Sequence, residues 1–326
     1  MVRHRLCVAM TAYNGANYIR EQLDSIAAQS RLPDELIVCD DHSVDCTPEI
    51  VEDFASKARF PVRLIVNDEN LGYVKNTEKA ISLSTGSIIF LSDQDDIWHP
   101  EKLRRAEAIF SNSPRVGAVF SNAEIVDEHL NPLGYSLWHS ANFTKSRQKR
   151  FARGKTFKVL CEGNVVYGCT MSFRATFKDL VLPISRIWDD DEWIALLVST
   201  AAELAVVHEP LVKYRQHSNN AFGAQKKASL SERLNRAQQP GGTTIYSGLA
   251  DQYASLHRRL LEATGYPRDL RAISMLEDRI KHLRERAEIE ERGILNRLPS
   301  VLQELATLRY HRYSGGWKSA AKDLLF

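Results

Sequence analysis

The first hundred residues alternate between short apolar runs and amphipathic stretches. Four apolar runs have the length and composition of buried strands: 6–11, 35–39, 62–66 and 87–91. The segments between them carry apolar residues at helical spacing, in 19–27, from Thr47 onwards and in 74–83. Because strands that alternate with helices of this length need right-handed crossovers, the pattern predicts a doubly wound, mostly parallel, Rossmann-like α/β sheet.

The alternation continues less regularly to about residue 225. The expected elements are a helix at 101–111, a strand at 116–120, a hairpin near Asn131 and Pro132, a strand at 165–173, a helix at 192–202 and a strand at 204–214. The intervening stretch 139–158 is polar and basic, which predicts a mobile loop.

Beyond residue 225 the pattern becomes heptad-like and rich in charge, as in 270–291. The segment 239–242 reads QPGG and has the composition of a linker. The sequence therefore predicts two parts, an α/β domain at 1–225 and a mainly helical region at 226–326.

Composition and charge limit the classes of partner. The chain has 43 Lys and Arg against 41 Asp and Glu, a balance that argues against nucleic acid but suits a phosphate-bearing partner. The five cysteines are odd in number and form no CxxC pair, which favours free thiols in a reducing compartment. The sequence shows neither a signal peptide nor an apolar run of about 20 residues, so we expect a cytoplasmic protein, at most docked on a membrane surface.

Three carboxylates follow the fourth apolar run within four positions: Asp93, Asp95 and Asp96. They repel one another unless a cation or hydrogen-bond donors compensate them. Oxygen ligands at this density suit Mg²⁺ or Mn²⁺ that shares its shell with substrate phosphates. The alternative is an acidic turn that caps the helix starting near Pro100.

Four motifs occur in order at the ends of the predicted strands: TAYNG at 11–15, DDHSVDCT at 40–47, NLG at 70–72 and SDQDDIW at 92–98. The series resembles family 2 of the glycosyltransferases, which have the GT-A fold, over about residues 1–225. The second motif matches the DDxSxDxT pattern of that family. The last one resembles the DQDDxW version seen in bacterial rhamnosyltransferase-like members.

The resemblance implies roles for several residues. Thr11, Tyr13 and Asp41 are expected to line the nucleotide base and ribose, and Asn70 lies in the third motif of that binding region. Asp93 is expected to contact the ribose or the metal, and Asp95 to ligate the metal at the donor diphosphate. The sequence does not separate Asp40 from Asp41, and both have the alternative role of capping the turn before Thr47.

A second acidic cluster, 189–192, lies between Trp188 and Trp193. Acidic residues favour a first helical turn, but that does not account for four in succession. Related proteins carry an HDxW-like segment here whose Asp is the general base of an inverting transfer. The resemblance implies Asp191 as base and Trp193 as its aromatic neighbour in contact with the substrate. Asp190 stands where those proteins have His, so Asp189 and Asp190 remain competitors.

Two further segments resemble parts of the family site. In Tyr214–His217 the sequence YRQH is similar to a YRxH motif, which implies a metal contact for His217 and a phosphate contact for Arg215, although Arg215 also fits a surface ion pair. Gly168 lies in a segment that lines the sugar cleft in the family. Its lack of a side chain fits either close approach of a ligand or tight packing of a strand.

These features together predict an inverting, metal-dependent glycosyltransferase that uses Mn²⁺ or Mg²⁺. The expected donor is a nucleoside diphosphate hexose or deoxyhexose, dTDP-rhamnose first, with UDP-galactose, UDP-N-acetylgalactosamine and UDP-glucose as alternatives. The expected acceptor is a lipid-linked or other oligosaccharide of a surface polysaccharide or O-antigen. The rival functions are a non-catalytic sugar-nucleotide-binding module and a nucleotidyltransferase, whose basic glycine-rich phosphate loop the segment 11–20 lacks.

Basic and aromatic residues are mixed at the C-terminus: Leu308, Arg309, Tyr310, His311, Arg312, Tyr313, Trp317, Lys318, Leu324, Leu325 and Phe326. This mixture favours a membrane interface. It fits equally a helix packed on the first domain or on a second copy of the chain, which would make a homo-oligomer.

Overall fold

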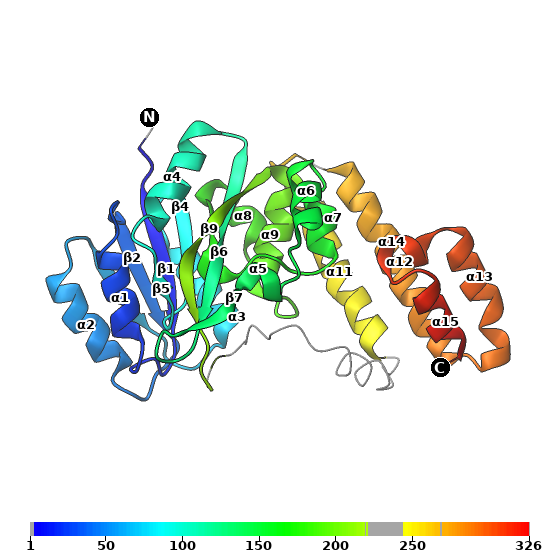
Figure 1. Cartoon of the computed structure of the whole chain (residues 1–326), viewed down its shortest axis with the longest axis horizontal. Coiled ribbons are helices and arrows are strands. Elements are labelled where there is room, and N and C mark those ends of the chain that lie inside the picture. The colour runs from blue at the N-terminus through cyan, green and yellow to red at the C-terminus, as the bar shows by residue number, and fades with distance from the viewer. Residues whose placement is uncertain (1–2, 219, 221–243, 268, 326) are drawn as a thin grey trace. The chain divides into compact units, whose positions relative to one another are not determined.

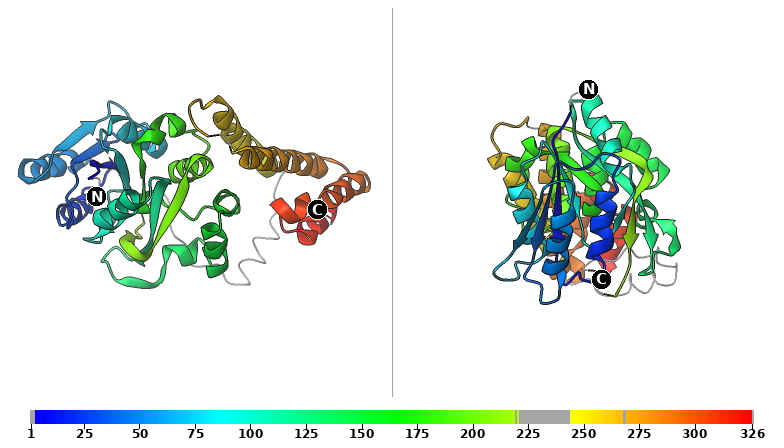
Figure 2. Two further views of the ribbon diagram at one scale, coloured as in Figure 1. Left: turned by 90° about the horizontal axis from the view of Figure 1, so that it is seen from above. Right: turned by 90° about the vertical axis from the view of Figure 1, so that its left-hand side faces the viewer.

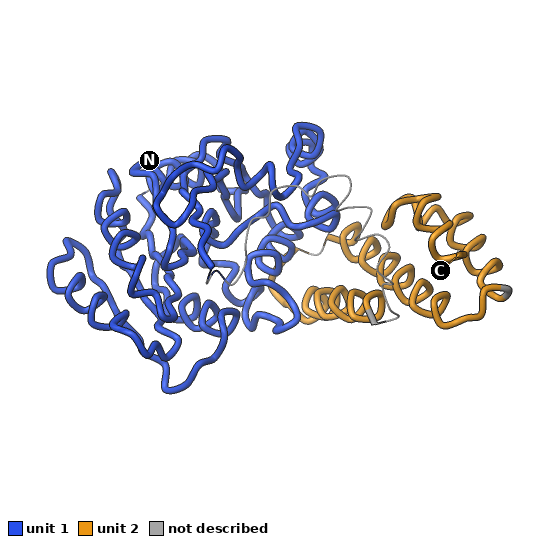
Figure 3. The backbone as a smooth tube through the Cα atoms, turned by 60° about the horizontal axis from the view of Figure 1, so that its bottom comes forward, with its two compact units in different colours: residues 1–227 blue, residues 228–326 orange. Residues whose placement is uncertain are grey.

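The chain forms two compact units, residues 1–227 and 228–326 (Figure 3). A computed structural model describes residues 3–218, 220, 244–267 and 269–325. The expected boundary near residue 225 and the expected linker at 239–242 lie outside the described residues. We therefore describe each unit by itself.

Unit 1 is built on a nine-stranded sheet of order β3-β2-β1-β4-β8-β6-β9-β5, with β7 paired to β6 (Figure 1). Its strands are β1 (Leu6–Ala12), β2 (Glu35–Asp40), β3 (Val62–Val66), β4 (Ile88–Ser92), β5 (Ile97–Trp98), β6 (Val116–Val126), β7 (Pro132–Ser136), β8 (Met171–Arg174) and β9 (Glu203–Arg215). The four apolar runs predicted as strands correspond to β1 to β4, which pair in parallel.

Beyond β4 the sheet is mixed. β8 runs antiparallel to both β4 and β6, whereas β6 and β9 pair in parallel. β5 and β7 add antiparallel pairs. The sheet is doubly wound, as predicted, but its parallel character is confined to β1 to β4 and to the β6–β9 pair.

Helices lie on both faces of this sheet (Figure 2). Those of unit 1 are α1 (Ile19–Ala27), α2 (Thr47–Lys57), α3 (Tyr73–Leu83), α4 (Lys102–Asn112), α5 (Leu137–Ser140), α6 (Lys145–Ala152), α7 (Thr156–Cys161), α8 (Lys178–Val181) and α9 (Asp190–Ala201), with 3-10 turns η1 (Gly168–Thr170) and η2 (Ala175–Phe177). On α1 the predicted apolar side is fully buried at Ile19, Leu23 and Ile26. This burial ties the first helix to the core beneath β1.

The direction in which successive strands are added to the sheet reverses between β1 and β4, which are parallel neighbours. The crossovers through α1 and α2 add β2 and β3 on one side of β1, and α3 returns the chain to β4 on the other side. In doubly wound sheets the ligand lies outside the carboxyl ends of the strands at such a switch point. The motifs at 11–15 and 92–98 follow these two neighbouring strands.

The basic stretch 139–158 is not the loop that we predicted, because it forms α6 and the start of α7. Aromatic side chains anchor it: Phe143 and Phe151 pack edge-on at 5.7 Å between ring centroids, and Phe151 lies 5.6 Å from Phe120 of β6. Burial of such rings contributes far more than the local polarity suggests. Apolar residues spaced among many charges hid these short helices from the sequence pattern.

Unit 2 is helical, as its heptad-like pattern predicts. It contains α11 (Thr244–Glu262), α12 (Leu270–Glu291), α13 (Leu298–Ala306), α14 (Arg309–Tyr313) and α15 (Trp317–Leu325), with a 3-10 turn η3 (Ile294–Asn296). A small core of Ile289, Val301, Tyr310 and Ala320 joins the last four helices. None of the described helices of either unit is long and apolar enough to cross a bilayer.

Candidate functional site

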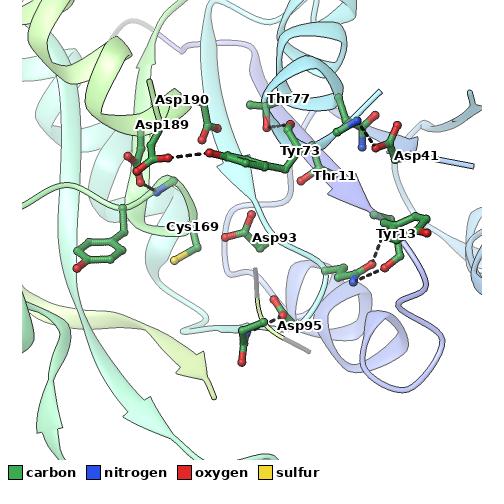
Figure 4. A pocket seen from close by; sticks show the side chains of 18 of the residues that line it. Thr11, Tyr13, Asp41, Tyr73, Thr77, Asp93, Asp95, Cys169, Asp189 and Asp190 are labelled. Atoms are coloured by element: carbon green, nitrogen blue, oxygen red, sulfur yellow. Dashed lines mark hydrogen bonds between the residues drawn. The ribbon is translucent and has the colours of Figure 1, made fainter. Parts of the chain in front are cut away.

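An acidic cavity of about 550 Å³ opens at the carboxyl ends of β1, β2 and β4 (Figure 4). Among its described lining residues six are aspartates and none is Lys, Arg or His: Asp41, Asp93, Asp95, Asp189, Asp190 and Asp191. The structure therefore brings together both acidic clusters, which are about a hundred positions apart in the sequence. Thr11, Tyr13, Asn70 and Gly168 line the same cavity.

The first wall of the cavity is a loop held by reciprocal hydrogen bonds. The Tyr13 N–H donates to Gln94 Oε1 and Gln94 Nε2 donates to the Tyr13 carbonyl, both at 2.9 Å. A Cβ on Gly15 would lie 2.0 Å from Gln94 Oε1, so only glycine allows this close contact. The segment after β1 is thereby fixed to the acidic loop after β4.

The second motif positions the same loop mainly through its own hydroxyl and carboxylate groups. Cys46 occupies the cap position of α2 without a side-chain cap hydrogen bond, and Thr47 is the first helical residue. The Thr47 hydroxyl accepts a 2.8 Å hydrogen bond from the Gly15 N–H, and Asp45 accepts one from the Ala16 N–H. The second motif thus joins the loop after β2 to the loop after β1.

Asp40 and Asp41, which the sequence did not separate, have different environments. Asp40 is fully buried and accepts hydrogen bonds from the Ser43 N–H and hydroxyl, so it is the cap of the turn and does not line the cavity. Asp41 lines the cavity, and its carboxylate accepts hydrogen bonds from the N–H groups of Leu71 and Gly72 at 2.8 and 2.9 Å. Its contacts hold the third motif against the first wall.

Two carboxylates of the acidic loop after β4 meet a thiol of η1: the ligand atoms of Asp93, Asp96 and Cys169 lie within 4.8 Å of one another. Burial first, and then the charge of Asp96, raises the pKa of Asp93 well above its ordinary value. Burial and the charge of Asp95 raise the pKa of Asp96 to about 7. Because burial also raises the pKa of the Cys169 thiol, the carboxylates are the better ligands for a hard cation.

One buried ammonium lies beneath this loop. Lys102 is 2% exposed, donates to the Cys169 carbonyl, and lies 3.5 Å from the centroid of the Trp98 ring. Burial lowers its pKa to about 7. Lys102 is not a lining residue, and its charge acts from below on Asp93 and Asp96, where it partly opposes the rise of their pKa values.

His217 meets Asp95, as the predicted metal pair requires. Its Nε2 lies 2.8 Å from Asp95 Oδ2, and Asn220 Nδ2 lies 3.2 Å from the same oxygen. The His217 ring stacks on Tyr18 at 4.5 Å between centroids. His217 itself does not line the cavity, so its place at Asp95 is at the rim.

Arg215 has a different place from the one predicted for a phosphate ligand. Its side chain is 3% exposed and lies outside the cavity. Its Nε donates to the Asp95 carbonyl and its Nη1 to the Glu128 carbonyl, both at 2.8 Å, while Nη2 pairs with Glu21. Since all three nitrogens donate within the protein, Arg215 supports the acidic loop and is not aimed at a substrate.

The second wall is the start of α9. Asp191 accepts hydrogen bonds from Asn164 Nδ2 and the Gly168 N–H, each at 2.9 Å. Burial first, and then the charges of Asp190 and Asp189, raise the pKa of Asp191 well above its ordinary value. A carboxylate held by two donors and with a raised pKa has the properties of a general base.

The two competing carboxylates are engaged elsewhere. Tyr73 of α3 donates its hydroxyl to Asp189 Oδ1 at 2.7 Å, a bond that joins the two walls (Figure 4). Burial raises the pKa of Asp190 to about 6, and a hydrogen bond from Thr77 opposes that shift. Of the three, Asp191 is the one that the η1 turn holds.

Trp193 lies outside the cavity, in contrast to the substrate contact that we predicted. It is 2% exposed, and its indole Nε1 donates to the Val181 carbonyl at 2.7 Å. Gly168, by contrast, points into the cavity, because a Cβ built on it meets no atom within 4 Å. Tight strand packing therefore does not explain this glycine, which lies in a 3-10 turn where we predicted strand.

Several lining residues carried no signal in the sequence. Tyr73, Asn164 and Tyr167 come from elements that only the fold brings to the cavity. Gln94 was visible within the SDQDDIW motif, but its clamp on Tyr13 depends on the parallel pairing of β1 with β4. Only a prediction of which strands are neighbours could have found that contact.

The sequence model of Glycosyl transferase family 2 matches residues 7–180. The chain is 26% identical over 223 residues to an uncharacterised protein of Mycobacterium tuberculosis, covering 67% of this chain and 60% of that protein. It thus spans about 60% of the length of this relative and of its counterpart in Mycobacterium bovis. The dTDP-rhamnosyl transferase RfbG of Shigella flexneri is 26% identical, covering 74% of this chain and 85% of RfbG.

Two solved structures share the fold. TarS 1–349 of S. aureus in complex with UDP-GlcNAc superposes with a TM-score of 0.58 at 16% identity, covering 98% of this chain and 81% of that one. The mannosyltransferase PcManGT of Pyrobaculum calidifontis, in complex with GDP-Man and Mn²⁺, gives a TM-score of 0.51 at 19% identity, covering 99% and 79%.

Proposed function

The chain belongs to glycosyltransferase family 2, and we propose that it transfers a hexose or deoxyhexose from a nucleoside diphosphate to an oligosaccharide acceptor, with inversion. The observation that carries the proposal is the charge of the cavity, which has six aspartates and, among its described lining residues, no cationic side chain. A diphosphate would be repelled there unless a divalent cation accompanied it.

The carboxylates fit such a cation. Asp93 and Asp95 lie on one loop, and burial followed by the charges of Asp96 and Asp95 raises the pKa of Asp93. Asp95 would hold the ion with His217 at its rim, and Mn²⁺ or Mg²⁺ would offset the charge that builds on the leaving nucleoside diphosphate. The Mn²⁺ that accompanies GDP-Man in PcManGT supports this assignment.

The nucleotide would lie along the first wall. Thr11, Tyr13 and Asn70 line that end of the cavity, beside the Asp41 carboxylate. Tyr13 is 49% exposed, so its ring is available to a base. Asp40 keeps the turn in place without contacting the donor.

Asp191 would act as the base at the second wall. Its carboxylate takes the proton of an acceptor hydroxyl while that oxygen bonds to the anomeric carbon and the bond to the diphosphate oxygen breaks. One displacement inverts the anomeric centre. The bonds from Asn164 and Gly168 orient the carboxylate for this transfer.

The first candidate donor is dTDP-rhamnose. The similarity to the dTDP-rhamnosyl transferase RfbG, which extends over 85% of that protein, supports this choice. UDP-galactose, UDP-N-acetylgalactosamine and UDP-glucose are the alternatives. The acceptor would be a lipid-linked surface glycan made on the cytoplasmic side of the membrane. The five free thiols are compatible with a reducing compartment.

A panel of these four donors with Mn²⁺ tests the proposal. We expect one donor to be consumed far faster than the others and the product to have the opposite anomeric configuration by NMR coupling constants. Consumption of none, together with binding of one, would favour the non-catalytic sugar-nucleotide-binding module. A product of retained configuration would remove the role of Asp191 as base.

A further inference from the structure

The stretch from residue 129 to residue 161 has seven Lys and Arg and no Asp or Glu. The whole chain is nearly balanced, with 43 cations and 41 anions, so the excess is local. The seven residues are Lys145, Arg147, Lys149, Arg150, Arg153, Lys155 and Lys158. All belong to α6, α7 and the turn between them.

Two of these cations serve the fold. Arg147 donates to four carbonyl oxygens at 2.7 to 3.2 Å, those of Ala141, Asn142, Val159 and Gly163. Arg150 pairs with Glu162. Arg147 thereby joins α6 rigidly to the end of α7.

The other five are exposed, and the ion pairs found within the described residues include none of them. They form what we call the basic surface: Lys145, Lys149, Arg153, Lys155 and Lys158. Lys145 and Lys149 are four residues apart on α6, a spacing at which like charges destabilise a helix. This arrangement opposes stability of the isolated protein and favours an anionic partner.

The basic surface is linked through hydrogen bonds to the wall of the cavity that holds Asp191, the proposed general base. The carbonyl of Gly163 accepts from Arg147, and the next residue, Asn164, donates to the Asp191 carboxylate. The α7 helix also packs on α9, whose first turn carries Asp191. An object bound to α6 and α7 would therefore lie near the side where an acceptor hydroxyl must reach.

We propose that the basic surface docks unit 1 on an anionic lipid bilayer and so brings a lipid-linked acceptor to the Asp191 side of the cavity. The docking itself requires only anionic headgroups, whereas its purpose rests on the function proposed above. Each Lys or Arg near such a surface contributes about 1 kcal/mol at physiological salt.

The character of the surface favours a bilayer over other anions. Its cations are spread over two helices and a turn, which suits an extended layer of charge better than a single phosphate. The aromatic and aliphatic side chains of α6 and α7 are buried, so there is no exposed ring on them to stack on a nucleic-acid base. The same burial predicts binding by charge alone, without insertion.

The C-terminal segment, the place where the sequence favoured a membrane contact, is a weaker candidate. Arg309 pairs with Glu304 and Asp278, and the Tyr310 side chain is fully buried. Its remaining exposed cations, Arg312 and Lys318, are fewer than those of the basic surface. Charge that is already neutralised within unit 2 adds nothing to docking.

Vesicle flotation of the full chain tests the proposal. The probe is a vesicle with one third phosphatidylglycerol in phosphatidylcholine, and pure phosphatidylcholine is the blank. The variant is Lys145→Gln/Lys149→Gln/Lys158→Gln, which keeps helix propensity. The matched control, Arg63→Gln/Arg115→Gln/Lys213→Gln, removes the same charge from exposed sites elsewhere in unit 1. A third variant, Arg312→Gln/Lys318→Gln, tests the C-terminal segment.

The wild type should float with anionic vesicles at 50 mM salt and lose binding at 500 mM, because salt screens the attraction. The α6–α7 variant should bind about 100-fold more weakly, from about 1 kcal/mol per residue. The control should change binding much less. Equal binding by all variants, a loss only in the C-terminal variant, or tighter binding to single-stranded DNA than to vesicles would overturn the proposal.

A separate assay distinguishes this proposal from the proposed function. Transfer to a soluble oligosaccharide should be unchanged in the α6–α7 variant, since none of its three residues lines the cavity. Docking without any sugar transfer would leave the basic surface intact as a membrane contact and remove its purpose. Transfer without docking would leave the proposed function intact and remove the basic surface as a membrane contact.

Discussion

Carboxylates in the core of unit 2 and in the cavity of unit 1 have opposite surroundings. In unit 2 each is matched by a cation: Asp323 accepts two hydrogen bonds from Arg286 at 2.7 Å, and Glu304 lies 2.6 Å from His282 Nδ1 and 2.8 Å from Arg309. In unit 1 the described lining of the cavity has six aspartates and no cationic side chain. In unit 2 the negative charge of the carboxylates is balanced within the protein. In the cavity of unit 1 negative charge remains for a cationic ligand.

The direction of the pKa shifts follows this difference. Burial would raise the pKa of Glu304, but hydrogen bonds from His282 and Arg309 bring it below the ordinary value. Burial raises the pKa of Asp191, and only neutral donors oppose the shift. Removal of one partner of a buried pair is costly because the other charge is left unmatched, whereas acids without a cationic partner in a cavity are typical of functional sites.

Substitutions at these charged groups should consequently affect activity in unit 1 and stability in unit 2. Asp191→Asn should lower kcat by about 10²–10⁴-fold with little change in donor affinity, since it removes the base and keeps the volume. Its melting temperature should change little, because relief of the repulsion by Asp190 and Asp189 opposes the loss of one of the two hydrogen bonds that the carboxylate accepts. Steady-state kinetics and a thermal melt check both statements.

The neighbouring variant is the control for this assignment. Asp190→Asn should reduce kcat much less, because the Asp191 carboxylate remains on the η1 turn. An inactive Asp190→Asn together with an active Asp191→Asn would show that the base is Asp190.

In unit 2, removal of one partner of a buried pair should be costly. Arg286→Met leaves Asp323 without its cation and should destabilise unit 2 by about 3–5 kcal/mol. The double variant Arg286→Met/Asp323→Asn should lose less than the two single changes together. Denaturant melts of the full chain measure these losses, and additive effects would contradict the pairing.

Stability should depend on pH in a way that metal removes. The folded pKa values of Asp190 and Asp96, about 6 and about 7, lie above the ordinary 3.8, so their contribution is complete below pH 3.8 and is lost as pH rises through 6 to 7. In EDTA the melting temperature should therefore fall between pH 5 and pH 8. Mn²⁺ should reduce this fall, because a cation at Asp93 and Asp95 offsets the charge near both groups, and an unchanged slope would count against a metal at Asp93 and Asp95.

A smaller effect is expected at Gly168. A Cβ there meets no protein atom within 4 Å, so Gly168→Ala should leave the free energy of unfolding within about 0.5 kcal/mol of the wild type. If a sugar approaches the backbone at Gly168, the KM of the Gly168→Ala variant should rise while its free energy of unfolding stays unchanged. A loss of stability without a change in KM would make the glycine structural.

The sequence revealed the first wall better than the second. Strands β1 to β4 are continuous apolar runs, and the motifs follow their ends, so pattern and motif agree at Thr11, Asp41 and Asp93. The family resemblance then placed Asp191 beside them. Residues of both walls could be predicted because each lies at the start or end of a regular element.

Side-chain direction was beyond the sequence. Trp193 and Arg215 lie in motifs yet point into the protein, because each has a buried carbonyl to satisfy. Tyr73 reaches Asp189 only because α3 and α9 meet at the cavity. The helices α6 and α7 were missed because their buried rings are separated by charged residues on short elements.

The central claim is that the uncompensated acids of unit 1 bind a divalent cation together with a nucleoside diphosphate. Calorimetric titration of dTDP and of UDP into the full chain, once in EDTA and once with Mn²⁺, tests it most directly. We predict that at least one nucleotide binds with Mn²⁺, that neither binds measurably in EDTA, and that Asp95→Ala abolishes the difference. Equal affinity with and without the metal would contradict the claim.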